Sequence, residues 1–482
     1  MAVDYDLVII GSSKVGIYAA HQAALLQARV ALVTQSDRLL LPDNSFKSQA
    51  IAEIARLNYK ANNHPVAEAS VVSSLNEAQT WAANVDLVQQ TQNSLANLAA
   101  LGVDVIADTG KFCPLPRLSF QTTKRQLRSR KFLLATGTSF RAQCPPERDK
   151  EAYLTSDELW QTDLTGLGAK IIVVGGNPAA LELAQTLVRF AKEVVLVMPQ
   201  PRILSSEDPE VVLMLQAQLE AEGIKIYTDA PVKQIKTIDG QKWLQAGDFA
   251  LTASQIVVTS DRQPHITGLN LKEVGVKCDR RRVHVNRRLQ THNPDIYACG
   301  DLIGGYSLPS VARYEADIAL KNILFFSFYR TDYNSVPWVI STQPNFARVG
   351  LTPRQAEARY GRDLYIIREY IADLDFAQIS AATMGMCKLL VHQNGTVIGC
   401  TLIGDRAEEL IVVISLLIRH KIKLGSNPLR GLTTPVLTAI SPSMSEIWQR
   451  ASDNFYRQKL RQNSPLRARL QSWHSLRRKW HQ

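Results

Sequence analysis

Two segments of this chain share one local pattern, a short apolar strand that ends at a glycine and leads into a helix and a second strand. The first segment starts with the strand Asp6–Ile10, turns at Gly11 and closes with the strand Arg29–Val33. The second starts at Lys170 and closes with the strand Glu193–Met198. Because a helical crossover of this length joins parallel strands, the pattern predicts an α/β chain with two Rossmann-like sheets.

The first turn, Gly11 to Gly16, indicates what such a fold would bind. A dinucleotide-binding turn has glycine at its first, third and sixth places, for the sharp turn, the approach of a pyrophosphate and helix packing. Gly11 and Gly16 keep the outer places, whereas Ser13 takes the middle one. Thr34 ends the second strand, where an acid for the ribose hydroxyls is expected. On these residues alone, a cofactor site and a purely structural unit are both open.

The second turn departs further from the dinucleotide pattern. Gly175 and Gly176 are present, with Glu182 on the helix that follows. Asn177, however, puts a side chain where a pyrophosphate would lie, because only glycine leaves that space free. The next strand ends in Met198-Pro199 without an acid for the ribose. NAD(P)H binding at this turn is therefore the less favoured reading.

A third stretch, Arg288–Asp301 (RLQTHNPDIYACGD), contains an apolar run that stops at Gly300-Asp301. The glycine allows backbone to approach a ligand at a strand end, and the aspartate can fix a polar or phosphorylated group there. A similar strand end occurs at Lys131–Gly137 (KFLLATG).

Together these motifs resemble the pyridine nucleotide-disulfide oxidoreductases, most closely the branch with mercuric reductase and dihydrolipoamide dehydrogenase. The resemblance runs from about Asp4 to Arg450. It implies an FAD-binding domain at 1–150 and 263–335, an NAD(P)-binding-like domain at 151–262, and a C-terminal α+β dimerisation domain at 336–453 that forms a homodimer. The implied FAD residues are Gly11, Ser13, Gly16, Thr34, Ala135, Thr136, Gly137, Gly300 and Asp301. The implied NAD(P) residues are Gly175, Gly176 and Glu182.

The reactive residues of that family are replaced. The best register places Pro42 and Lys47 at the two positions of the redox CxxxxC pair, and no cysteine occurs nearby. Thiolates are the groups that pass electrons to a disulfide or dithiol. Ser441 stands where lipoyl enzymes have their acid-base histidine, although Glu446 is retained. Because serine cannot shuttle a proton near neutral pH, no catalytic residue is assigned, and disulfide, mercuric or lipoyl reduction is not expected.

The cysteines and the N-terminus indicate the cellular compartment in which the protein is expected. The six cysteines are scattered, without a CxxC pair, which is typical of free thiols in a reducing compartment and predicts no metal site. The N-terminus has no basic region and enters a strand at once, and no apolar run reaches the roughly 20 residues that span a bilayer. We expect a cytoplasmic protein, or one bound peripherally at a membrane.

The charge of the chain is concentrated at its end. The net charge is +11, but residues 454–482 hold eight Lys/Arg and no acid, so the rest carries only +3. A helix is predicted from Ser464-Pro465, with Leu466, Leu470, Trp473 and Trp480 on one face. Such a basic amphipathic tail suits a membrane surface or an acidic partner. The alternative is a solvated helix packed loosely on its own dimer; nucleic acid is unlikely, since no recognition fold precedes the tail.

Two functions follow from these observations. The first is an FAD flavoprotein that passes electrons from NAD(P)H, or another donor, to a non-disulfide acceptor, because a flavin carries that chemistry itself. The second is a catalytically inactive family member, a dimeric scaffold or binding protein tethered by its basic tail.

Overall fold

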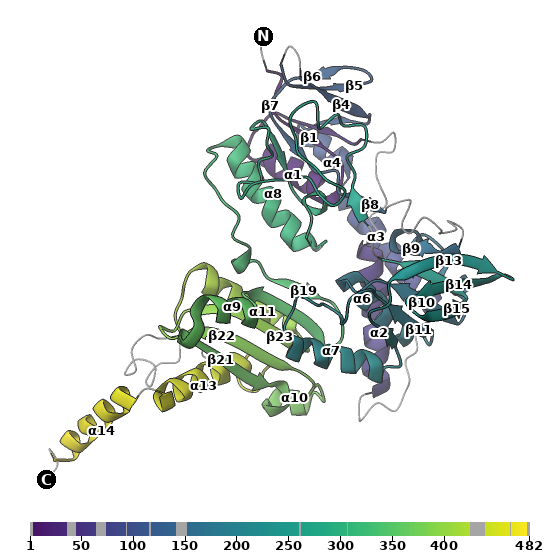
Figure 1. Cartoon of the computed structure of the whole chain (residues 1–482). Helices are drawn as coiled ribbons and strands as arrows, with labels where there is room; N and C mark the ends of the chain where they lie inside the picture. The colour runs from purple at the N-terminus through teal and green to yellow at the C-terminus, as the bar shows by residue number, and fades with distance from the viewer. Residues whose placement is uncertain are drawn as a thin grey trace. The chain divides into compact units, whose positions relative to one another are not determined.

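A computed structural model describes residues 3–35, 45–63, 74–92, 94–114, 117–140, 152–259, 262–305, 307–424, 439–462 and 464–479. The chain forms two compact units (Figure 1). The first consists mainly of Met1–Asn63, Ala67–Leu204 and Glu220–Asp332, and the second mainly of Ser205–Leu219 and Tyr333–Gln482. Within the described residues, no helix combines the length and the hydropathy that crossing a bilayer requires.

The first sheet of unit one is parallel throughout, with strand order β18-β7-β1-β2-β3. Its strands are β1 (Tyr5–Ile10), β2 (Val30–Val33), β3 (Asp104–Ile106), β7 (Ser129–Leu134) and β18 (Ile296–Ala298). β1 and β2 are continuous apolar runs because both faces of such a sheet are covered. Helices α1 (Lys14–Leu25) and α8 (Pro309–Leu324) lie side by side against it.

The second sheet of unit one is also parallel, with strand order β12-β11-β10-β16-β9. Its strands are β9 (Leu154–Thr155), β10 (Lys170–Val174), β11 (Glu193–Val197), β12 (Lys225–Tyr227) and β16 (Gln255–Val258). Helix α6 (Pro178–Arg189) follows β10 and packs on β10 and β11. Two strand–turn–helix units thus occur in the chain as the sequence pattern predicts.

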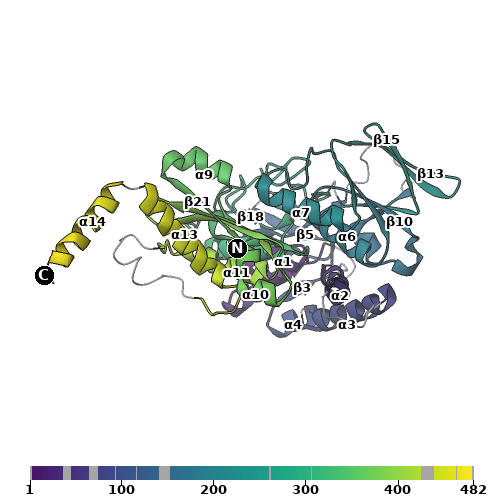
Figure 2. The same ribbon diagram turned by 90° about the horizontal axis from the view of Figure 1, so that it is seen from below.

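Smaller elements complete unit one. Two antiparallel three-stranded sheets are formed by β4 (Gly110–Cys113), β5 (Ser119–Thr122) and β6 (Gln126–Leu127), and by β13 (Val232–Ile238), β14 (Gln241–Ala246) and β15 (Phe249–Ala253). β8 (Thr138–Phe140) pairs with β17 (Arg262–Pro264). Helices α2 (Ser45–Asn63) and α3 (Leu75–Gln92) run side by side (Figure 2), followed by α4 (Leu95–Ala100); α5 (Ser156–Leu159) follows β9.

Unit two is built on an antiparallel sheet of order β19-β20-β23-β22-β21. The strands are β19 (Trp338–Ile340), β20 (Asn345–Gly350), β21 (Leu364–Tyr370), β22 (Met386–His392) and β23 (Val397–Gly404). Its helices are α7 (Pro209–Ala221), α9 (Pro353–Tyr360), α10 (Asp375–Ile379), α11 (Ala407–Arg419), α13 (Glu446–Gln462) and α14 (Ser464–Lys479). α11 and α13 share one apolar core with the sheet.

Buried ion pairs fasten the segment Ser205–Leu219 within unit two. Lys388 on β22 is 4% exposed, and its Nζ lies 2.6 Å from a carboxylate oxygen of Asp208 and 2.5 Å from one of Glu210. Arg348 pairs with Glu207 in the same way, at 2.8 Å. Alternate residues of a strand face opposite sides, so Lys388 points away from the core that its neighbours Cys387 and Leu389 enter.

Candidate cofactor site

The turn after β1 lies close against the loop after β7. A Cβ added to Gly11, whose φ is +108°, would lie 2.5 Å from the Ala135 carbonyl oxygen. A Cβ on Gly16 would lie 2.1 Å from the Gly11 carbonyl oxygen. Neither position has room for a side chain, so both glycines are required by this contact. The structure therefore brings Gly11, Gly16 and Ala135 together, at the carboxyl ends of two neighbouring strands.

Ser13, in the middle place of the fingerprint, has a structural task. Its side chain caps α1 by accepting a hydrogen bond from the Gly16 amide at 3.3 Å, and its hydroxyl donates to the Ala135 carbonyl at 2.6 Å. The hydroxyl thus turns toward the neighbouring strand end. Serine in place of glycine is therefore compatible with the turn between β1 and α1.

Thr136 has a buried hydroxyl that makes no hydrogen bond within the described part of the chain. Its side chain is 9% exposed, and its Oγ1 has no hydrogen-bond partner among the described residues. Buried hydroxyls in native proteins are nearly always paired. Gly137 follows with a φ of +69°. An unpaired hydroxyl at the carboxyl end of a parallel sheet, where such folds bind nucleotides, fits a site that a ligand completes.

Thr34 lies at the end of β2 and is buried. Its amide donates to the Ile106 carbonyl at 3.0 Å, and its own carbonyl accepts the Ser12 hydroxyl at 3.4 Å. Thr34 thus joins three segments at the sheet edge, but it supplies no carboxylate for a ribose.

Gly300 and Asp301 follow β18 and lie beside the start of α1. A Cβ on Gly300, at φ +77°, would lie 3.0 Å from Val15 Cγ1. The Gly300 amide donates to the buried carboxylate of Glu315 on α8 at 2.7 Å. Asp301 accepts the Ser307 hydroxyl at 2.6 Å. The signature at the end of β18 and the fingerprint after β1 therefore form one site.

Glu315 is a member of this site that the sequence analysis does not identify. Its carboxylate is buried on α8 and fixes the backbone at Gly300. Burial, with the Glu315 charge as a second cause, raises the pKa of the Cys299 thiol well above its ordinary value. Cys299 is therefore no substitute nucleophile. The signal that points to Glu315 is an acid among the buried and mostly apolar residues of α8.

These residues fit FAD. Gly11 and Gly16 let the turn pack closely, the N-terminus of α1 favours a pyrophosphate, and Asp301 and Thr136 supply polar groups at the ends of the neighbouring strands β18 and β7. Hydride and electron transfer are what bound FAD would supply.

The second dinucleotide turn fits its ligand less well. Gly175 has a φ of +139°, and a Cβ on Gly176 would lie 2.8 Å from Met198 Sδ. Asn177 caps α6 by accepting from the Ala180 amide at 2.9 Å, and its side-chain nitrogen donates to the Thr259 carbonyl at 2.9 Å. The asparagine thus occupies the helix end where a pyrophosphate would bind. Glu182 lies half-buried on α6.

Replacing Asn177 by glycine tests this interpretation. The change should remove the cap and the bond to Thr259, lowering stability by about 1 kcal/mol, and should tighten NADH binding about tenfold because an amide and its space are freed. NADH titration and thermal unfolding measure the two effects. The matched control is Ser13→Gly in the first turn, which should leave NADH affinity unchanged. Unchanged NADH affinity in Asn177→Gly would contradict the blocking role.

Pro42, Lys47 and Ser441 are the residues that the predicted register aligns with the family's reactive groups. Pro42 lies outside the described residues. Lys47 lies on α2, and its Nζ is 3.5 Å from the carboxylate of Asp86 on α3, so it ties two helices together. Ser441 is exposed, whereas Glu446 begins α13 with an Oε1 that is buried and unpaired among the described residues. The described residues contain no cluster of three or more His, Cys, Asp or Glu side chains that could hold a metal ion.

Comparison with known proteins identifies two family models in the chain. The model described as "Pyridine nucleotide-disulphide oxidoreductase" matches residues 5–316. The model for the "dimerisation domain" of the same family matches residues 336–451. The tail beyond residue 451 lies outside both matches.

Individual relatives agree with these models. A mercuric reductase of Bacillus cereus is 27% identical over 455 residues, which cover 90% of this chain and 70% of the relative. A dihydrolipoyl dehydrogenase of Bacillus subtilis is 28% identical, covering 85% and 91%. Among solved structures, LpdA from Mycobacterium tuberculosis has a TM-score of 0.82 at 23% identity, covering 93% and 98%. The flavoprotein disulfide reductase RclA from Escherichia coli has a TM-score of 0.79 at 22% identity, covering 94% and 99%.

Proposed function

The chain belongs to the pyridine nucleotide-disulphide oxidoreductase family, and from that membership we propose an FAD-dependent oxidoreductase that works without a dithiol. Bound FAD would supply electron transfer to an acceptor that is not a disulfide, such as a quinone, a dye or a protein. In this family, some residues hold the flavin and others act on a disulfide, and the two groups of residues can be compared separately.

One contrast supports the proposal most. The residues expected to hold the flavin include the close-packed glycines, the unpaired Thr136 hydroxyl and Asp301. The segment where the family's redox cysteines are expected has no cysteine between residues 38 and 61, and Lys47 forms an ion pair with Asp86. A flavin needs the protein mainly for binding, orientation and electrostatics. The chain keeps residues suited to those tasks and has no cysteine in the segment where the family's redox pair is expected.

The electron donor is a weakly held nicotinamide nucleotide in this proposal. Gly175 and Gly176 still allow a close approach of backbone, but the Asn177 cap competes with the pyrophosphate. NADH and NADPH should therefore reduce the flavin only at high concentration. The match to the family's dimerisation domain at 336–451 supports a homodimer.

A second candidate function, a tethered scaffold, rests on the tail. α14 is exposed along most of its length and lies in the stretch of eight Lys/Arg without an acid. It also lies outside the family matches. A tethered dimer without electron transfer would use this helix to bind a membrane surface or an acidic partner.

Purified protein separates these two functions. We expect a yellow protein whose visible spectrum shows about one FAD per chain, because the first turn and the Gly300-Asp301 signature fit the cofactor. NADH or NADPH added without oxygen should bleach it slowly, and a quinone or dye should restore the colour. Disulfide substrates should not restore it, since the thiolate route is missing.

Two outcomes would contradict the proposal. A folded but colourless protein that takes up no added FAD would favour the scaffold. Reoxidation by a disulfide as fast as by a quinone would show that some group replaces the dithiol.

A further inference from the structure

A row of aromatic side chains lies exposed after α8. We name Phe325, Phe326, Phe328 and Tyr329 the aromatic loop. Phe326 is 71% exposed and Phe328 59% exposed. The rings of Phe326 and Phe328 stack with centroids 6.0 Å apart, and those of Phe328 and Tyr329 at 4.5 Å. Single exposed apolar residues are ordinary, but a contiguous group marks an interaction surface.

The backbone of the loop is held in place from inside. Asn322, which is buried, donates from its side-chain nitrogen to the carbonyls of Arg288 and Tyr329, each at 2.9 Å. The Tyr329 amide donates back to the Asn322 side-chain oxygen at 2.9 Å. The exposed rings are thus presented by a fixed turn, so their ordering needs little further entropy on binding.

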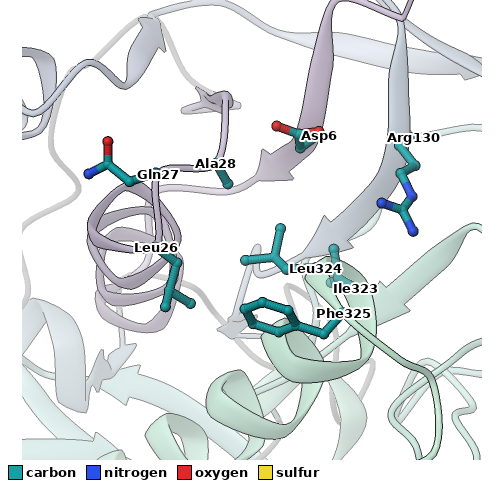
Figure 3. Close-up of a pocket in the computed structure, with 8 residues that line it drawn as sticks. All are labelled: Asp6, Leu26, Gln27, Ala28, Arg130, Ile323, Leu324 and Phe325. Carbon is teal, nitrogen blue, oxygen red and sulfur yellow. The ribbon is translucent and has the colours of Figure 1, made fainter.

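Phe325, the first residue of the loop, also lines a cavity that has both apolar and polar residues in its wall. A cavity of about 200 Å³ lies at the amino ends of β1 and β7, and Figure 3 shows Phe325 and Leu26 on one side of it, with Asp6 and Arg130 on the other. Leu25 and Leu26, at the end of α1, are each about half exposed. Aliphatic and aromatic side chains therefore share one surface.

Cations surround this surface. Arg130 lines the cavity, Arg330 directly follows the loop, and Lys321 lies over the Tyr329 ring at 5.6 Å. Arg287 is exposed, and its carbonyl accepts the Thr331 amide at 2.7 Å. The acids at this edge include Asp6, which accepts the Arg29 amide, Asp295, which pairs with Lys131 at 2.6 Å, and the exposed Asp4 and Asp332. The balance on this face is positive.

We propose that this face of unit one docks on an anionic phospholipid surface. Aromatic and aliphatic side chains enter the boundary between headgroups and acyl chains, and cations around them pair with lipid phosphates. The exposed Leu25 and Leu26 favour lipid over a nucleic acid, because stacking on bases needs aromatic rings and cations but no aliphatic side chains. The inference stands apart from the proposed redox function and from the tail.

The test is co-sedimentation of the full-length protein with vesicles. To weaken the contribution of α14, four of its five cations, Arg467, Arg469, Arg477 and Arg478, are first replaced by glutamine. This protein should bind vesicles of phosphatidylcholine with phosphatidylglycerol but not of phosphatidylcholine alone, and salt should release it. Phe326→Ser with Phe328→Ser should weaken binding at least about tenfold. Arg287→Ser with Arg330→Ser should weaken it about as much.

The matched control is Leu87→Ser, which changes a similarly exposed residue on α3, 64% exposed. It should leave vesicle binding unchanged. The proposal is overturned if the double phenylalanine variant sediments like its parent, or if the parent binds no anionic vesicle. It is also overturned if the phenylalanine changes abolish binding of a single-stranded oligonucleotide, or dissociate an oligomer, while vesicle binding is unaltered.

Discussion

Replacing Lys388 by methionine is expected to lower the free energy of unfolding by about 3–5 kcal/mol. Lys388 is the partner that Asp208 and Glu210 share, and Asp208 is only 3% exposed. Methionine keeps most of the volume but leaves a buried carboxylate without its cation. Water cannot compensate, so the full desolvation cost of the charge appears in the stability. Urea and thermal unfolding measure the loss.

Two control variants separate burial from charge. Lys225→Met breaks an exposed pair with Glu193, whose atoms lie 3.3 Å apart, and should change stability by no more than about 0.5 kcal/mol. Adding Asp208→Asn to Lys388→Met should recover part of the loss, since it removes the unpaired charge. Equal effects of Lys388→Met and Lys225→Met would contradict the buried network.

The same network predicts a dependence on pH. Burial acts to raise the pKa of Glu210, but the ion pairs with Lys388 and Arg368 outweigh it and lower the pKa. A carboxylate with a lowered pKa adds stability above its unfolded pKa, and that contribution is lost as pH falls through the folded value. Burial raises the pKa of Glu207 instead, against the pairing with Arg348. Ionisation of Glu207 therefore lowers the stability of the fold as pH rises above the pKa that this group has in the unfolded chain.

Gly11→Ala is expected to abolish flavin binding and to destabilise the protein by roughly 2–6 kcal/mol, from backbone strain and overpacking together. The new Cβ would lie 2.5 Å from both the Ala135 carbonyl oxygen and the Thr136 Cα. Relief requires the β1 turn and the β7 loop to separate, which opens the cofactor site. Flavin absorbance per chain and the melting temperature report both effects.

Gly102→Ala is the matched control for Gly11→Ala. Gly102 also has a positive φ, +85°, but nothing lies within 4 Å of an added Cβ. It should cost only the backbone strain, about 1–2 kcal/mol, and leave flavin content unchanged. A Gly11→Ala protein with full flavin content would show that the turn is not closely packed.

The fold could be predicted from the sequence because its signals are local and repeated. A strand, a glycine turn and a helix are each encoded by neighbouring residues, and two such units occur, at Gly11 and Gly175. The predicted fold class, two Rossmann-like domains and a C-terminal dimerisation domain, is confirmed. The domain boundaries stay a prediction.

The site could be predicted only in part, because the roles of several of its residues depend on contacts with residues that are distant in the sequence. A glycine pattern treats Ser13 and Asn177 as simple losses, but both are helix caps that also bond a neighbouring strand end. Glu315 is recognised only when Gly300 is seen beside it. Lys388 stands in an apolar strand, and nothing local indicates which acids approach it.

The segment Ser205–Leu219 has a consequence for how this protein is made. The chain leaves unit one after Leu204, contributes most of α7 to unit two, returns at Glu220, and leaves again at Tyr333. Neither unit is therefore one continuous stretch of polypeptide. On the ribosome, Glu207 and Asp208 emerge long before Lys388, and unit two cannot close until β22 is synthesised. Folding of unit two is thus a late, long-range step, and neither unit can be obtained by a single cut in the gene.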